Sequence, residues 1–204
     1  MKNITLLALD TSTEACSVAL WHKGEKTHLD ELAQRTHTKR ILPMVDELLA
    51  NSGINLKQLD ALAFGRGPGS FTGVRVGAGI AQGLALGADL PVIAVSNLTA
   101  MAQAAFELHQ AENVAAAIDA RMNEVYFSQV KREKERSELG EFFQWNPVIE
   151  EQVCQPEKVL EQLSDLTAYR VGTGWAAYPQ FKDSGLEGSR SEERRVGKEC
   201  SEPC

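Results

Sequence analysis

Carboxylates close two of the chain's apolar runs, and their neighbours could bind a phosphate. The run at residues 4–9 ends on Asp10, which opens the turn "DTST", and a later run ends on Asp119 in "AAAIDARMNEVYFSQV". A carboxylate, hydroxyls and backbone N–H groups in one tight turn can hold a metal-bound nucleotide phosphate. The same residue types also form ordinary capped hairpin turns, so "DTST" by itself leaves both interpretations open.

An internal repeat favours the nucleotide site. Asp119 precedes Phe127 by the same spacing as Asp10 precedes Val18, and each segment predicts a strand, a polar turn and an alternating strand. Two such units that face each other would form a nucleotide cleft between two lobes, where the glycines of "VGTG" could let the backbone approach an adenosine. The predicted nucleotide-binding residues are Asp10, Thr11, Ser12, Thr13, Asp119, Gly172 and Gly174.

The stretch "GRGPGSFTGVRVGAG", residues 65–79, resembles a phosphate-binding loop only in its glycine content. No Gly-Lys-Ser/Thr follows it, and the G-x-G-x-x-G spacing of a dinucleotide fold is not met. Small residues instead recur at helical spacing, on one line formed by Gly73, Gly77, Ala81 and Ala85 and on another formed by Gly79, Gly83 and Gly87. Such lines let helices pack at close range. We expect one line to pack on the protein's own sheet, which leaves the other for a partner.

Few other residues offer catalytic chemistry. Ser70 in "GPGSFTG" lacks the second glycine of a G-x-S-x-G nucleophile elbow, because that position is Thr72. The four histidines form no i, i+4 pair, so we predict no helical metal site. The run "KREKER" at residues 131–136 lies in an acidic chain and is interpreted as a solvated strand end rather than an RNA-binding patch. We predict no catalytic residue and no metal ligand.

Composition narrows the class of protein. The chain has 204 residues, 43% of them hydrophobic, and a formal net charge of -7. Such a chain does not bind nucleic acid alone through a broad basic face, so any role with RNA is expected to need a partner. The four cysteines show no CxxC or zinc-like spacing, and neither a secretory leader nor a membrane-length apolar segment occurs, so we expect a reducing, cytosolic compartment.

Hydrophobic periodicity predicts a mixed sheet with helical layers. An antiparallel meander over residues 4–32 precedes a helix from Thr38, in which Pro43 predicts a late start or a kink and Gly53 a C-terminal stop. Buried strands "LDALAFG" and "PVIAVS" alternate with a small-residue helix to Gly87 and a helix at residues 98–109. Later segments predict an irregular or edge segment "SELGEFFQWNPVIEE", a short helix "PEKVLEQL" and a strand "TAYRVGTGW". The predicted lobes are residues 1–109 and 110–188, followed by a disordered or non-native tail at 189–204.

Four motifs together, "LALDTST", "HTKRILPMVDELL", "GRGPGSFTGVRVG" and "VGTGW", resemble the bacterial TsaB (YeaZ) family. The resemblance implies an α/β fold of the actin-like class (ASKHA, ribonuclease H-like), with two lobes, a mixed sheet and flanking helices. It also implies a cytoplasmic, non-catalytic scaffold subunit in the synthesis of N6-threonylcarbamoyladenosine at tRNA position 37. In the catalytic relative TsaD two histidines four apart help to ligate a metal; Asn97 and Met101 stand at the matching positions here, and neither can replace imidazole.

The resemblance also implies partners. TsaD is the catalytic partner, TsaE joins the pair, TsaC supplies the activated donor, a second copy of the chain replaces TsaD when TsaD is absent, and tRNA is bound only through the complex. No cofactor of the chain's own is implied, whereas ATP or ADP with Mg²⁺ would bind at the TsaD interface. The interface residues carried over by motif are Ile41, Leu42, Val45, Leu49, Gly73, Val76, Gly77 and Ile80. A stand-alone actin-like ATPase or kinase is the alternative, and a glycoprotease-like peptidase is a weaker one, because no metal pair or nucleophile with its base is visible.

Overall fold

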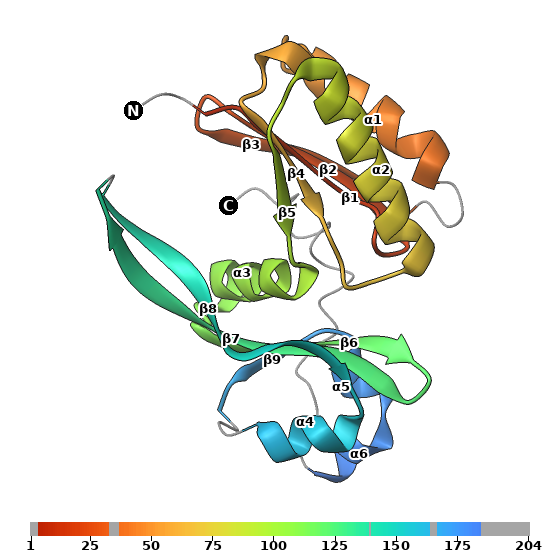
Figure 1. The fold of residues 1–204 in the computed structure, drawn as a ribbon, viewed down its shortest axis with the longest axis vertical. Helices are drawn as coiled ribbons and strands as arrows, with labels where there is room; N and C mark the ends of the chain where they lie inside the picture. Colours follow the sequence, from red (N-terminus) through yellow and green to blue (C-terminus); the bar gives the residue numbers. More distant parts are fainter. Residues whose placement is uncertain (1–3, 33–36, 139, 164–166, 185–204) are drawn as a thin grey trace. The chain divides into compact units, whose positions relative to one another are not determined.

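The chain packs as two units. The computed structural model describes residues 4–32, 37–138, 140–163 and 167–184, and Figure 1 shows its two sheets with their helices. The first unit ends at Asn97 and the second begins at Leu98. The observed boundary lies twelve residues before the predicted one, which follows residue 109. The difference arises because the buried side of helix α3 (Asn97–His109) packs with strand residues of the second unit. The predicted tail at residues 189–204 lies outside the described residues.

A five-stranded mixed sheet forms the first unit, in the order β3-β2-β1-β4-β5. β1, β2 and β3 form the predicted antiparallel meander, and β4 and β5 run parallel to β1. Cys16, Val18 and Leu20 are buried as predicted, since alternate residues of a strand face the same side. The strands are β1 (Leu6–Asp10), β2 (Ala15–His22), β3 (Glu25–Leu32), β4 (Ala61–Gly65) and β5 (Val92–Val95).

One prediction about this sheet is wrong. "PVIAVS" forms strand β5, but its side chains are not buried: Val92 and Ile93 are 41% and 47% exposed. β5 is the edge strand of its sheet, and the helix over residues 71–88 packs mainly on the neighbouring strand β4, which leaves β5 less covered. A short apolar run predicts a strand but does not say whether both faces of that strand are covered.

Helices α1 (His37–Asn51) and α2 (Phe71–Ala88) pack on this sheet and contact each other, and a 3-10 turn η1 (Leu56–Gln58) leads into β4 (Figure 1). α1 begins ahead of Pro43, so the predicted late start is wrong. Pro43 is exposed, so water can satisfy the carbonyl group that its missing N–H leaves free. The helix stops where predicted: Gly53 has a φ of +66° and its N–H donates to Ala50.

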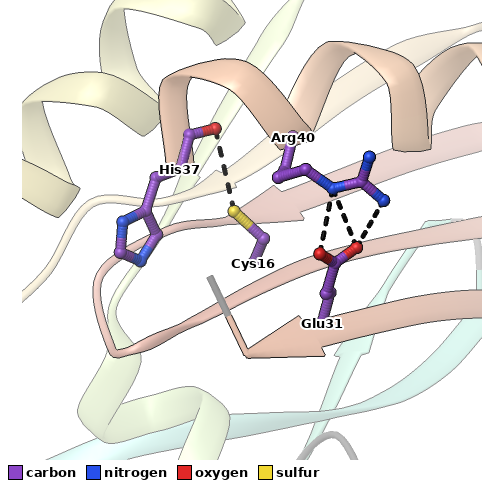
Figure 2. A network of polar contacts seen from close by, with 4 residues as sticks. All are labelled: Cys16, Glu31, His37 and Arg40. Atoms are coloured by element: carbon purple, nitrogen blue, oxygen red, sulfur yellow. Dashed lines mark hydrogen bonds and ion pairs between the residues drawn. The ribbon is translucent and has the colours of Figure 1, made fainter. Parts of the chain in front are cut away.

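Polar contacts join the start of α1 to strands β2 and β3 (Figure 2). Arg40 on α1 donates from Nε and a terminal nitrogen to the carboxylate of Glu31 on β3. The thiol of Cys16 on β2 points at the carbonyl oxygen of His37, 3.8 Å away. Burial, with the charge of Glu31, raises the pKa of the Cys16 thiol to about 11, so this cysteine is a protonated core residue at neutral pH.

The second unit repeats the plan of the first. β6 (Asn113–Arg121), β7 (Glu124–Ser137) and β8 (Gly140–Cys154) form an antiparallel meander, and β9 (Tyr169–Val171) pairs parallel to β6, in the order β8-β7-β6-β9. α3 packs on one face of this sheet. The other face carries the core around Trp175 and Phe181, supplied by α4 (Pro156–Gln162), α5 (Gly174–Ala177) and α6 (Pro179–Asp183). The shared topology agrees with the predicted repeat.

The two lines of small residues on α2 have different surroundings. Gly73, Gly77, Ala81 and Ala85 are the buried residues of the helix. A Cβ atom at Gly79, Gly83 or Gly87 would meet nothing within 4 Å. One line therefore packs inside the unit and the other borders open space, as predicted.

This difference predicts opposite effects of the same substitution. A Cβ at Gly73 would collide with the backbone carbonyl of Thr11, so Gly73→Ala should lower the free energy of unfolding by about 1–3 kcal/mol. Gly83→Ala should raise it by about 0.5–1 kcal/mol, because alanine is the better helix former and the site is open. Urea unfolding of both variants checks this; equal effects would contradict the packing described.

Candidate functional site

The predicted phosphate turn lies where three parallel strands end. Asp10 ends β1, the glycine-rich loop follows β4 at Gly65, and Asn97 follows β5 and begins α3. The carboxyl ends of parallel strands are where open α/β sheets bind ligands. These residues, all in the first unit, therefore form the candidate functional site.

Asp10 is held by the turn that it opens. Its carboxylate accepts from the N–H of Ser12 at 2.5 Å, and the Ser12 side chain and the Thr11 N–H also bond to it. Burial has the largest effect on the pKa of Asp10 and raises it. The hydrogen bonds lower the pKa and so offset part of this rise. A Cβ at Gly65 would lie 2.5 Å from Asp10 Oδ2, so glycine at that position makes room for the carboxylate.

The hydroxyls of the turn are committed to the protein itself. Thr11 Oγ1 donates to the carbonyl oxygen of Gly73 at 2.7 Å. Ser12 Oγ accepts from the side-chain amide of Asn97 at 2.5 Å. Thr11 and Ser12 are 1% and 2% exposed, and Thr13 Oγ1 accepts from the N–H of Ala15. Nucleotide binding here stays a prediction, and Thr11 and Ser12 would have to leave these partners to contact a phosphate.

Asn97 ties the glycine loop to the turn. Its backbone N–H donates to Gly67 O at 2.9 Å, and its side-chain amide donates to Pro68 O as well as to Ser12. At the next turn of α3, Met101 is 6% exposed and belongs to the core of the second unit. Asn97 therefore fixes the glycine loop, and Met101 packs in a core.

The glycine loop serves a structural purpose. A Cβ at Gly69 would lie 2.6 Å from Ser12 O, and one at Gly77 would lie 2.8 Å from Thr11 Oγ1. Ser70 caps α2 by accepting from the N–H of Gly73, and its own N–H donates to Ser12 O. The glycines thus admit the chain's own turn rather than a phosphate.

The corresponding turn of the second unit is built differently. Asp119 Oδ1 accepts from the N–H of Arg121, as Asp10 accepts from Ser12, but it also accepts from the phenol of Tyr178 at 2.7 Å. Burial by itself would raise the pKa of Asp119, yet the bonds from Tyr178 and Arg121 with the Arg121 charge outweigh it and lower that pKa. Sequence reasoning missed Tyr178, since nothing near Asp119 in the chain points to it.

The two glycines of "VGTG" also pack closely against the protein's own backbone. A Cβ at Gly172 would collide with the carbonyl oxygen of Ala117 on β6, and one at Gly174 would lie 2.9 Å from the carbonyl carbon of Ala117. Gly172 has a φ of +102°, which strongly favours glycine. Close packing on the neighbouring strand β6 accounts for both glycines, and the predicted adenosine contact stays a prediction.

Most of the predicted interface residues are interior. Five of them are buried within the first unit and leave little surface for a partner: Ile41, Val45, Leu49, Gly73 and Gly77. The physical reason is that a helix buries its apolar stripe against its own sheet first. The stripe in the sequence looks the same whether a sheet or a partner covers it.

The rest of the predicted interface keeps some surface. Leu42 is 43% exposed, and Val76 and Ile80 are half-buried. Sequence reasoning missed two further apolar residues of α2, Phe71 and Leu86, which are 75% and 88% exposed. The predicted interface therefore narrows to the outer side of α1 and α2.

Neither a group of metal ligands nor a membrane-length apolar helix is found among the described residues. Among them, no three His, Cys, Asp or Glu side chains group as metal ligands. Of the helices described, none is both long and apolar enough to cross a bilayer.

Two units that share a meander with a parallel strand define an α/β protein of the actin-like class. A family model described as "TsaD: tRNA N6-adenosine threonylcarbamoyltransferase" matches residues 28–186. The tRNA threonylcarbamoyladenosine biosynthesis protein TsaB of Haemophilus influenzae is 78% identical over 189 residues, which are 93% of this chain and 80% of that protein. The chain belongs to the TsaB (YeaZ) family.

Further similarities agree with this family. The protein of the same name from Escherichia coli K12 is 52% identical over 184 residues, covering 89% of this chain and 77% of that one. The solved structure of YeaZ from Pseudomonas aeruginosa has a TM-score of 0.74 and 43% identity, over 92% of this chain and 81% of that chain.

The two aspartates predict opposite pH effects. The pKa of Asp10 lies above its ordinary value of 3.8 in the folded protein, so the native state binds more protons than the unfolded state above that pH and ionisation lowers stability. Asp10→Asn should therefore gain stability relative to the wild type as the pH rises from about 4 to 7.

Asp119→Asn provides the matched comparison. The folded pKa of Asp119 lies below 3.8, so its stabilising effect is present above that pH and is lost as the pH falls through the folded value. The wild type should therefore be more stable than Asp119→Asn at neutral pH, and this difference in the free energy of unfolding should shrink as the pH falls. Thermal unfolding against pH checks both variants, and profiles of the same sign would contradict the two environments.

Proposed function

We propose that this chain is a non-catalytic scaffold subunit in the synthesis of N6-threonylcarbamoyladenosine on tRNA. The relatives are named for that biosynthesis, and the family model is named for the transferase TsaD. On this proposal the chain pairs with TsaD and supports its activity. One observation carries the non-catalytic role: Asn97, where the catalytic relatives bear a metal-binding histidine, is occupied by hydrogen bonds to Ser12 and Pro68.

The proposed pairing surface is the outer side of α1 and α2. Phe71, Val76, Ile80 and Leu86 supply apolar area, and the open glycines beside them would let a partner helix approach closely. These side chains are spread over the part of an 18-residue helix that its buried residues leave open. A second copy of the chain would use the same surface when TsaD is absent, so the two pairings would be mutually exclusive.

The remaining roles extend the same proposal. TsaE would join the TsaD pair, ATP or ADP with Mg²⁺ would bind only where TsaD contributes to the site, and the chain would work in the cytoplasm. A stand-alone ATPase or kinase is the second candidate, and Asp10 at the ends of the parallel strands favours it. Titration of the isolated chain with ATP and Mg²⁺ separates the two: tight binding with turnover would support the enzyme, and binding only after TsaD is added would support the scaffold.

Copurification with TsaD tests the pairing. Gly83→Arg should abolish it, because the arginine would project from the open side of α2 without disturbing the core. Replacing Val76 and Ile80 together with Glu should have the same effect. Ala100→Arg, at an exposed position of α3, is the matched control and should leave copurification unchanged. Normal recovery of TsaD with Gly83→Arg would show that this surface is not the interface.

A further inference from the structure

The long hairpin of β7 and β8 separates its charges by face. Residues 131–136 read as a mixture of charges along the chain, but alternate residues of a strand face opposite sides. Arg132, Lys134 and Arg136 therefore share one face, and Glu133 and Glu135 lie on the other. The register places Trp145, Phe143 and Glu141 of β8 beside the three cations. Positive and negative charges that alternate along the sequence are therefore sorted by the strand onto two faces. One of these faces is cationic and aromatic.

Asn146 holds the two glutamates on the opposite face. Its side-chain amide donates to Glu133 at 2.8 Å and to Glu135 at 3.3 Å, and its carbonyl oxygen accepts from Gln144. These bonds fix the carboxylates away from the cations. On the cationic face the register places Glu141 opposite Arg136, and Glu141 pairs with Lys134.

Aromatic rings hold the Arg132 guanidinium in place. Its Cζ lies 3.8 Å from the ring centre of Phe106 on α3 and 3.7 Å from that of Phe143. The hairpin is further tied to α3 by Trp145, whose indole N–H donates to Gln103 at 2.9 Å. Stacking occupies the faces of the guanidinium and leaves its N–H edge for an acceptor. Since the side chain is already ordered, little rotamer freedom would be lost on binding.

We propose that this face, Arg132, Lys134, Arg136 and Phe143, binds unpaired nucleotides of RNA. Phe143 is 53% exposed and can stack on a base, while the flanking guanidinium groups match phosphate oxygens. Arg136 is exposed and lies about 13 Å along the strand from Arg132, so the two can contact different phosphates of one strand. The proposal rests on the proposed function, in which the RNA is a tRNA.

The basic charge and the exposed ring together favour RNA over an acidic protein surface. Both ligands would pair with the arginines, but only a nucleobase gains from the flat face of Phe143 beside them. The acidic net charge of -7 fits a face that adds contacts inside a complex rather than one that binds RNA alone.

Salt-dependent binding of tRNA tests the proposal. The wild-type chain in complex with TsaD is titrated with an unmodified tRNA transcript that carries adenosine at position 37, at several salt concentrations. Arg132→Gln and Arg136→Gln should each weaken binding about 3- to 10-fold and lower the slope of log K against log salt by about 1. Lys131→Gln removes the same charge from the other face of the strand and should change neither quantity.

The outcomes distinguish the alternatives. Equal effects of Lys131→Gln and Arg136→Gln, or no effect of either arginine variant, would overturn the proposal. Polyglutamate competition that depends on Arg132, with an unchanged tRNA slope, would overturn it in favour of an acidic protein ligand. Because Arg136 is exposed, Arg136→Gln remains informative if Arg132→Gln loosens the hairpin. Failure of the proposed function is seen separately, as failure of the wild-type chain to copurify with TsaD.

Discussion

The close approach between the Thr11–Ser12 turn and the glycines after β4 is the constraint on which the first unit depends. A Cβ at Gly69 or Gly73 would collide with the backbone of that turn. The contact sets the distance from the end of β1 to α2, and hydrogen bonds from Thr11 and Asn97 fix it. The side of α2 that carries Gly73 is buried inside the unit. The opposite side, with its line of glycines from Gly79, is therefore the side that a partner could contact.

The second unit keeps the topology and changes the contacts. Gly172 and Gly174 pack on Ala117, and the carboxylate of Asp119 binds Tyr178 rather than a serine. In both units the predicted nucleotide-binding residues contact the protein's own backbone or side chains, and nucleotide binding stays a prediction.

Sequence reasoning predicted the elements and the two glycine lines of α2 because period and residue size decide them locally. It could not tell whether a sheet or a partner covers an apolar stripe. Ile41 and Val45, which the motif predicts at a partner interface, are buried in the core of the first unit. The phosphate interpretation of Thr11 and Ser12 met the same limit, since their partners Gly73 and Asn97 are distant in the chain. The charge separation on β7 needed the strand register and the bonds of Asn146, which the run "KREKER" does not contain.

On the proposed function, this chain supports tRNA modification without performing it. Reconstitution of N6-threonylcarbamoyladenosine on unmodified tRNA, with TsaC, TsaD and TsaE and with or without this chain, tests it most directly. Modification is expected only when the chain is present, and none is expected when the chain replaces TsaD. Full modification without the chain, or modification by the chain in the absence of TsaD, would contradict the account.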